Sequence, residues 1–208
     1  MNEIGFRTPL TLGGKYVELV PLSPAHRVPL HFAARDPEVR RYLRNGPGAT
    51  LEELDARIAW LLARQADGTD LPFTILALPE RRPIGMTRYL RIDREDRSVE
   101  VGGTWLDSAH WRSPLNTESK YLLFRHAFEV EHVHRLQLQT DLRNERSQRA
   151  IERLGARREA VHRDDVLLPE GIYRTSVVYS VLEDEWPTVK RRLEEFLARP
   201  WSPSAAPP

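Results

Sequence analysis

Alternating and continuous apolar stretches along the chain predict a set of strands. The clearest is 98–106, where valines alternate with Glu100 and Gly102. An apolar stretch broken by Gly13 and Gly14 predicts one strand at the start, with apolar residues on both sides of the break. The strands expected after it cover 71–78, 84–92, 98–106, 133–141, 156–166 and 172–182.

Helices are predicted where apolar residues recur every three or four positions. Thr50 followed by Glu53 has the spacing of a capping box, and Leu54, Ile58 and Leu61 continue from it at helical spacing. Asp36 followed by proline is typical of a helix start. We expect helices over 36–43, from residue 50 onward, and over 114–130, 144–154 and 185–198.

This order of elements predicts an α/β (α+β) protein with a mixed sheet and helices on both of its faces. We expect a single domain over 1–198. The last ten residues, 199–208, are rich in proline, serine and alanine, which predicts a disordered tail.

Composition excludes several classes of protein. The 31 basic and 30 acidic residues give a net charge of +1, which argues against a nucleic-acid or membrane-surface partner. The chain has no cysteine, so thiolate catalysis, disulfide scaffolds and zinc ribbons are excluded. No apolar run approaches the length of a membrane span, and the start has no apolar signal core. We therefore expect a soluble cytoplasmic protein.

Glu100 is a carboxylate in the middle of an apolar strand. The two glycines that follow, Gly102 and Gly103, predict a bulge or a close backbone approach. Alternation would place Val99, Val101 and Trp105 on one face, and Glu100, Gly102 and Thr104 on the other. Glu100 is either a solvent-facing residue of a hairpin or a general base whose pKa is raised by burial.

The segment after this strand joins it to a long helix. Ser113 before Pro114 predicts the N-cap and first helical residue. The first-turn amides of such a helix carry partial positive charge and can bind a phosphate, and Arg112 adds a full charge. Most strand–loop–helix junctions bind nothing, however, and Glu118 is explained equally well by helix capping.

Two polar residues open the helix over 144–154. Asn144 and Ser147 precede Ile151 and Leu154 at helical spacing. One interpretation is N-capping by Asp141 or Asn144, and the other is that Asn144 and Ser147 face a ligand cleft.

Three linked segments resemble the GNAT superfamily of acyl-CoA-dependent N-acyltransferases, in particular its RimJ/RimL-like branch of ribosomal-protein alanine N-acetyltransferases. The segments are RSPLNTESKYLLFRHAFE, TDLRNERSQRAIERLGA and YRTSVVYSVLEDEW. The resemblance implies a mostly antiparallel sheet of about six to seven strands. It also implies acetyl transfer from acetyl-CoA to a primary amine, at a protein N-terminus or on a small molecule, and a homodimer.

The resemblance also assigns roles to individual residues. Asn144 matches a family residue that contacts the pantetheine, Ser147 a proposed proton donor to the thiolate, and Glu100 a carboxylate that relays the amine proton. The strand backbone at Thr104, Trp105 and Leu106 matches the part of the family strand that pairs with pantetheine. The loop amides that match the pyrophosphate cradle are those of Arg112, Ser113, Leu115, Asn116 and Thr117.

The chain departs from the family pattern in two places. The loop residues Trp111, Pro114 and Asn116 stand where the family has Gln/Arg, Gly and Gly/Ala, and Pro114 supplies no N–H. Ile151 stands where many members carry a tyrosine that acts as the general acid. Without cysteine an acyl-enzyme on sulfur is impossible, so direct attack of the amine in a ternary complex is expected.

The acceptor pocket is expected between the first two predicted helices, the 83–98 hairpin and the 164–172 segment. Any single candidate is better explained as an ordinary core or surface residue than as part of the pocket. The candidates are Arg41, Tyr42, Trp60, Tyr89 and Trp111. Alternatives to protein N-terminal acetylation are acetylation of an antibiotic, amino acid or polyamine, or a non-catalytic CoA-binding module.

Two further clusters carry weaker signals. His132 and His134 share a strand face but have no ligand partner at suitable spacing, so no metal is expected. Six arginines between 143 and 158 are interleaved with glutamates, which predicts a solvated helix face, with a contact to the cofactor 3′-phosphate as a further hypothesis.

Overall fold

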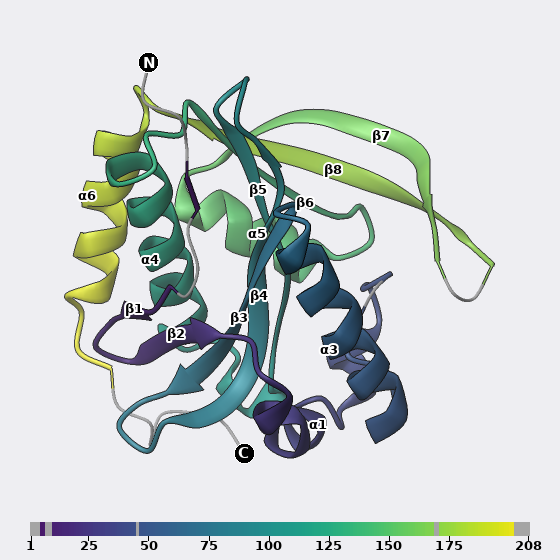
Figure 1. Cartoon of the computed structure of the whole chain (residues 1–208). Helices are drawn as coiled ribbons and strands as arrows, with labels where there is room; N and C mark the ends of the chain where they lie inside the picture. Colours follow the sequence, from purple (N-terminus) through teal and green to yellow (C-terminus); the bar gives the residue numbers. More distant parts are fainter. Residues whose placement is uncertain (1–4, 7–9, 45, 169–170, 202–208) are drawn as a thin grey trace.

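One mixed sheet organises the protein. The structure is a computed structural model that describes residues 5–6, 10–44, 46–168 and 171–201. The strands of its eight-stranded sheet lie in the order β1-β2-β3-β4-β5-β6-β8-β7, and only β5 and β6 are parallel (Figure 1). Their bounds are β1 Leu12–Gly13, β2 Val17–Pro21, β3 Asp70–Ala77, β4 Arg82–Asp93, β5 Ser98–Leu106, β6 Arg135–Asp141, β7 Arg157–Leu167 and β8 Tyr173–Leu182. The expected mixed, mostly antiparallel sheet is confirmed.

The sheet has eight strands where six to seven were expected. The difference lies at the start of the chain, where the glycine break is a turn between two strands. The amide of Gly14 donates to the carbonyl of Val17 at 2.9 Å, and Leu12 pairs with Leu19. One predicted strand is therefore the hairpin β1–β2.

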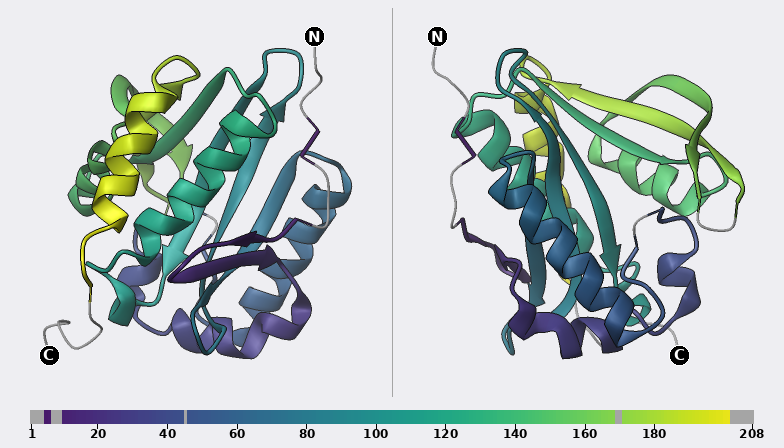
Figure 2. Two further views of the ribbon diagram at one scale, coloured as in Figure 1. Left: turned by 90° about the vertical axis from the view of Figure 1, so that its left-hand side faces the viewer. Right: turned by 45° about the vertical axis from the view of Figure 1, so that its right-hand side comes forward.

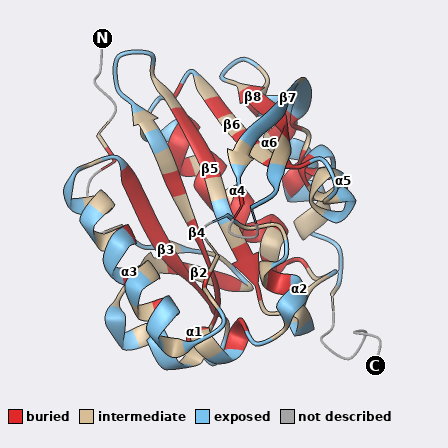
Figure 3. Cartoon of the chain, turned by 90° about the vertical axis from the view of Figure 1, so that its right-hand side faces the viewer, coloured by how far each residue is buried: buried red, intermediate tan, exposed pale blue. Residues whose placement is uncertain are grey.

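Helices cover both faces of the sheet (Figure 2). One apolar cluster joins α4, α5 and α6 to the sheet, and a second joins α1, α2 and α3 to the opposite face. In Figure 3 buried residues concentrate along β3, β4 and β5, while the outer surfaces of α1, α2 and α3 are exposed. The helices are α1 Arg27–Ala33, α2 Pro37–Arg40, α3 Leu51–Ala66, α4 Leu115–Glu129, α5 Glu145–Leu154 and α6 Trp186–Leu197. None of these helices, all within the described ranges, combines the length and apolar character that crossing a bilayer requires.

Capping residues explain where two helices begin. The hydroxyl of Thr50 accepts from the amide of Glu53, whose carboxylate accepts in return from Thr50, so the predicted capping box is confirmed. Asp36 likewise accepts from Glu38 at the start of α2.

The helix α1 and the short 3₁₀ turn before it, Pro24–His26, were not predicted from the pattern. Two prolines, Pro24 and Pro29, interrupt the segment, and only Leu30 and Ala33 of α1 are buried. Too few apolar positions remain to show a helical period.

The chain beyond α6 agrees only partly with the predicted tail. Residues 202–208 lie outside the described residues. Trp201, which the composition placed in the tail, packs its ring edge-on against Tyr16 at a centroid distance of 5.7 Å.

A bulge in β5 changes which face its side chains occupy. Met86 pairs with Trp105 and Arg88 with Gly102, so the register shifts between them, and Gly103 has φ of +57°. The bulge predicted from the glycine pair is confirmed. The predicted faces are wrong beyond it: Trp105 packs with α1 and α3, opposite Val99 and Val101, and Thr104 turns toward α4.

Strands β5 and β6 pair over a short distance and then separate. The paired residues run from Ser98 with Arg135 to Glu100 with Gln137. Beyond this point β5 continues to Leu106 and β6 to Asp141, without further pairing to one another. The facing edges of both strands therefore carry backbone groups that the sheet does not use.

Glu118 links α4 to the first hairpin rather than capping its own helix. Its buried carboxylate accepts from the amides of Lys15, Tyr16 and Val17 at 2.8, 2.6 and 2.8 Å. A Cβ at Gly14 would lie 2.5 Å from the carboxyl carbon, so glycine is needed for this close approach. The carboxylate thus fixes the β1–β2 turn on the helix.

Glu118→Gln is expected to lower the free energy of unfolding by about 2 kcal/mol, because an amide cannot accept from all three donors and places its own N–H₂ among them. Urea denaturation measures the change. Glu195→Gln, on the exposed face of α6, is the matched control. A loss below about 0.5 kcal/mol, the range of ordinary surface substitutions, would contradict this role.

Candidate active site

The candidate site lies where β5 and β6 separate. Glu100 is the last residue of β5 that pairs with β6. The loop after β5 leads to the N-terminus of α4, and the loop after β6 leads to the N-terminus of α5. The start of β8 lies at the same end, since Ser176 pairs with Asp141 at the end of β6. The topology therefore brings the beginnings of the three segments that carry the family resemblance to one end of the sheet.

The loop between β5 and α4 is held by its own side chains. Asp107 accepts from the amide of Ala109, and Trp111 donates its indole N–H to the carbonyl of Leu106 at 3.0 Å. Ser113 donates its hydroxyl to the carbonyl of His110 at 2.6 Å and accepts from the amide of Leu115 at 3.3 Å. These bonds constrain the conformation of the loop.

Helix α4 begins one residue later than predicted. The first helical bond runs from the amide of Glu118 to the carbonyl of Pro114, so Pro114 is the N-cap and Leu115 the first helical residue. The predicted N-cap at Ser113 is therefore wrong, although its hydroxyl still accepts from Leu115. Of the predicted cradle, the amides of Asn116 and Thr117 are first-turn donors that no helical carbonyl can reach.

Two features add charge and strain at this helix start. Arg112 has φ of +61°, a conformation that costs a non-glycine residue about 1 kcal/mol. Arg153 of α5 donates to the hydroxyl of Thr117 at 3.2 Å. A guanidinium from α5 thus adds positive charge beside the first turn of α4, which already carries the positive end of its helix dipole.

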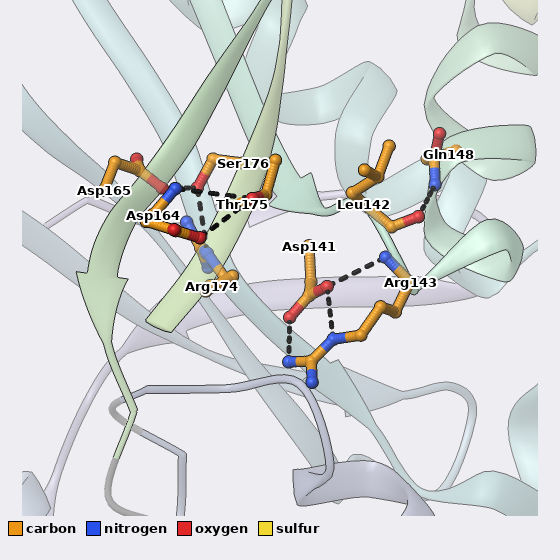
Figure 4. Close-up of polar contacts among 9 residues, drawn as sticks. All are labelled: Asp141, Leu142, Arg143, Gln148, Asp164, Asp165, Arg174, Thr175 and Ser176. Atoms are coloured by element: carbon orange, nitrogen blue, oxygen red, sulfur yellow. Dashed lines mark hydrogen bonds and ion pairs between the residues drawn. The ribbon is translucent and has the colours of Figure 1, made fainter. Parts of the chain in front are cut away.

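At the start of α5 the capping interpretation is confirmed for Asn144, whose side-chain oxygen accepts from the amide of Ser147 at 3.0 Å. Asp141 instead accepts from the backbone and guanidinium of Arg143 (Figure 4). This cap does not use the side-chain nitrogen of Asn144 or the hydroxyl of Ser147. Capping therefore leaves both groups able to contact a ligand. Ile151 is buried in the core.

Glu100 is a buried carboxylate, only 7% exposed. One of its oxygens lies in the space above Gly102 that a side chain there would fill, 3.1 Å from a Cβ built on that residue. Burial raises the pKa of Glu100, and the guanidiniums of Arg91, Arg88 and Arg174 lower it, with burial the larger effect. The solvent-facing interpretation of Glu100 is therefore wrong.

Arginines surround this carboxylate on several strands. Nη1 of Arg91 lies 3.1 Å from Oε2 of Glu100 and forms an ion pair with it, but the two groups are not aligned as a hydrogen bond. Arg174 of β8 donates to the hydroxyl of Ser176, which donates to Asp165 (Figure 4). These contacts hold Arg174 beside Asp141 of β6. Arg174 lies on β8, the strand between β6 and β7.

The predicted acceptor residues divide into different locations. Trp60, on α3, is 38% exposed and is covered by the guanidinium of Arg88, which also acts on Glu100. Tyr89 is fully buried on the opposite face and donates to the carbonyl of Leu123 at 2.6 Å. Its assignment to the acceptor pocket is wrong, because β4 alternates and directs Tyr89 toward α4.

The other three candidates lie near α2 and the loop. Arg41 stacks on Tyr42 at 5.4 Å, and Arg143 of the β6–α5 loop faces the same ring. Trp111 is covered by Arg146 of α5, 3.4 Å from the ring centroid. These residues thus lie near the start of α5.

Among the six arginines between 143 and 158, some lie on a solvated face as predicted. Arg149 pairs with Glu145 and Arg157 with Glu185, both at the surface. Arg146 and Arg153 differ, because each crosses to the β5–α4 segment.

Sequence reasoning missed several residues of this site. Arg57 and Arg64 recur at helical spacing with Trp60, which was already a candidate, and so share its face of α3, a signal that was available. Arg88 stands between Thr87 and Tyr89 in an apolar strand, as Glu100 does in its own. The buried Lys120 gave no such signal, since α4 is apolar on several sides.

Comparison with known proteins agrees with this architecture. The family model described as "Acetyltransferase (GNAT) domain" matches residues 17–157. Probable N-acetyltransferase YjcK of Bacillus subtilis (strain 168) is 26% identical over 136 residues, which are 65% of this chain and 75% of that protein.

Solved structures agree as well. A crystal structure assigned as an acetyltransferase from T. thermophilus is 42% identical, covers 93% of this chain and 100% of its own, and superposes with a TM-score of 0.84. A GCN5-related N-acetyltransferase from Brucella melitensis is 25% identical. It covers 95% of this chain and 90% of its own, and superposes with a TM-score of 0.86. The resemblance to the GNAT superfamily is thus confirmed, and the chain belongs to the GNAT family of acetyltransferases.

Proposed function

We propose that the protein transfers an acetyl group from acetyl-CoA to a primary amine, on a protein N-terminus or a small molecule. The observation that carries the proposal is the buried Glu100, placed where β5 and β6 separate. Acetyltransferases of the GNAT family use acetyl-CoA.

The residues around the separated strands fit the coenzyme. The free backbone edge of β5, at Thr104, Trp105 and Leu106, can pair with the amides of a pantetheine arm. The first-turn amides of Asn116 and Thr117, with Arg153 beside them, suit a diphosphate. Pro114 removes one donor from this cradle. A protein of the same fold, RimJ of Mycobacterium smegmatis, 18% identical with a TM-score of 0.79, was solved in complex with CoA-disulfide.

In the proposed reaction Glu100 accepts a proton from the acceptor ammonium, directly or through water. The neutral amine then attacks the thioester carbonyl, the C–N bond forms, and the C–S bond breaks to release thiolate. Backbone N–H groups at the bulge of β5 stabilise the oxyanion. As the C–S bond breaks, the new amide nitrogen loses its second proton. Ser147 is proposed to give its hydroxyl proton to the thiolate and to regain the proton that the nitrogen releases, because Ile151 cannot donate one.

The test uses purified full-length protein, acetyl-CoA and a panel of amines that includes N-terminal peptides, amino acids, polyamines and aminoglycosides. Thiol release is followed optically and the acetylated product is identified by mass spectrometry. We expect amine-dependent thiol release for at least one class. If calorimetry shows that acetyl-CoA binds while no amine releases thiol, the non-catalytic CoA-binding alternative is supported instead.

A further inference from the structure

Three polar side chains meet beneath the bulge of β5, on the face of the sheet that α4 covers. The side-chain nitrogen of Lys120 donates to the hydroxyl of Thr87 on β4 at 3.3 Å, and to the hydroxyl of Thr104 on β5. The two hydroxyls lie 2.8 Å apart and hydrogen-bond to each other. Lys120 and Thr87 are buried. We call these three residues the lysine–threonine cluster.

The cluster relies on its own members for hydrogen bonds. Leu123 and Phe124, about one helical turn further along α4, belong to the apolar core. Among the described residues no carboxylate pairs with Lys120, and the two hydroxyls accept its hydrogen bonds. A buried ammonium that loses an acceptor keeps the cost of its desolvation without the bond that offsets it. Lys120 therefore favours an arrangement of the strands that keeps both hydroxyls on its own face of the sheet.

The register of β5 decides whether Thr104 reaches Lys120. Side chains alternate along a regular strand, which would place Thr104 opposite Val101 and away from α4. The bulge reverses this direction, because Gly103 adopts φ of +57° and the pairing with β4 shifts. Without the bulge Lys120 would keep only the hydroxyl of Thr87. The cluster is thus complete only in the bulged register.

The bulge also lies in the part of β5 that would hold the coenzyme. Thr104 is the first residue of the free edge assigned above to the pantetheine arm, and N–H groups of the bulge are those proposed to stabilise the oxyanion. Asn116 and Thr117, whose amides suit the diphosphate, lie about one turn before Lys120 on α4. The same helix therefore carries the diphosphate site and the lysine that bonds to the bulge.

We propose that Lys120 is a positioning residue: through its bond to Thr104 it selects the bulged register of β5, and so places the backbone groups that hold the thioester. The inference rests on the proposed function, because this edge of β5 must receive acetyl-CoA. Buried polar groups can fix a register even where they do not add stability. The role of Lys120 is therefore compatible with an ammonium whose burial destabilises the fold.

Steady-state rates with an acceptor from the amine panel test this role. Lys120→Met and Thr104→Val each remove one side of the bond, and each should lower kcat about tenfold or more while the KM for the acceptor changes less than about threefold. Thr104→Ser keeps the hydroxyl and should stay within about threefold of wild type. Thr188→Val, on the exposed face of α6, should retain wild-type rates as the matched control. A folded Lys120→Met protein with the kcat of wild type would overturn the proposal.

The double variant tests whether the two residues act together. If Lys120 acts through Thr104, the protein that carries both Lys120→Met and Thr104→Val should be slower than the slower single variant by no more than about threefold. Losses that multiply would mean that the two residues act separately, and would overturn the proposal. The melting temperature of every variant is recorded, and rates are measured well below it, so that unfolding does not account for a lost rate.

Hydrogen exchange of backbone amides separates this inference from the proposed function, since it needs no turnover. It is recorded by NMR at pH 6 for wild type, Lys120→Met and Thr188→Val. In Lys120→Met alone, the amides that bond β5 to β4 between Gly102 and Leu106 should exchange about tenfold faster or more, while those of β3 do not. If acetyl-CoA binds but no amine releases thiol, the proposed function is wrong, and this local increase still supports the role of Lys120 in the register. Exchange equal to that of wild type overturns it.

Discussion

Glu100→Gln is expected to lower kcat by about 10²–10⁴-fold, the usual contribution of a positioned general base. Glutamine fills the same space above Gly102 but cannot accept a proton from an ammonium. The KM for acetyl-CoA should change little, because Glu100 is proposed to contact the acceptor amine and not the coenzyme. Thiol-release kinetics on the acceptor identified above measure both values.

A control separates chemistry from folding. Glu95→Gln, at the exposed tip of the hairpin that contains Glu100, should retain wild-type rates. Glu100→Gln itself should unfold at no lower temperature than wild type, because burial raises the pKa of Glu100 and so makes its ionised form unfavourable in the folded protein. A stable Glu100→Gln protein with a rate near wild type would exclude Glu100 as the base.

The pH profile follows from the same carboxylate. A base must be deprotonated to act, so kcat/KM falls as the pH drops through the pKa of Glu100, which lies above that of an ordinary glutamate. Arg91 is the nearest cation and is itself well exposed. Arg91→Gln removes a charge that lowers this pKa, and should therefore move the acidic limb of the profile to higher pH.

The order of elements from α2 onward was predictable from local pattern. The strand predicted at 98–106 coincides with β5, and the capping box of Thr50 and Glu53 locates the start of α3. Both depend on residues close together in sequence. The helix α1 was missed because the prolines around it hide its period.

The side-chain environment of the site was less predictable. One bulge at Gly103 reverses the faces of Thr104 and Trp105, and no spacing rule reports how a bulge resolves. The bonds from Glu118 to the first hairpin join residues about a hundred positions apart. Neither contact follows from local propensity, because the partners meet only when the sheet forms.

Lys120→Met is expected to stabilise the protein at pH 6 and to lose that advantage at pH 9. The ammonium of Lys120 is buried on α4 and donates only to the hydroxyls of Thr87, at 3.3 Å, and Thr104; among the described residues no carboxylate pairs with it. Burial lowers the pKa of Lys120 to about 7.

The sign follows from proton uptake. Between about pH 7 and the ordinary lysine value of 10.5 the unfolded chain holds a proton that the folded chain has lost, so wild-type stability rises with pH across this interval. Below pH 7 both states are protonated, and the folded state bears the full cost of a buried ammonium. Methionine removes this cost and gives up two hydrogen bonds, which leaves a gain of about 3 kcal/mol at pH 6.

Urea denaturation at pH 6, 7, 8 and 9 measures the difference in free energy of unfolding between wild type and Lys120→Met. The titration of groups that both proteins share cancels in this difference. The gain should shrink by about 1.4 kcal/mol per pH unit above pH 7. Lys15→Met, at an exposed lysine, should differ from wild type by a small, pH-independent amount. A Lys120→Met protein that is less stable than wild type at pH 6 would mean that the two threonine hydroxyls outweigh the desolvation of the ammonium.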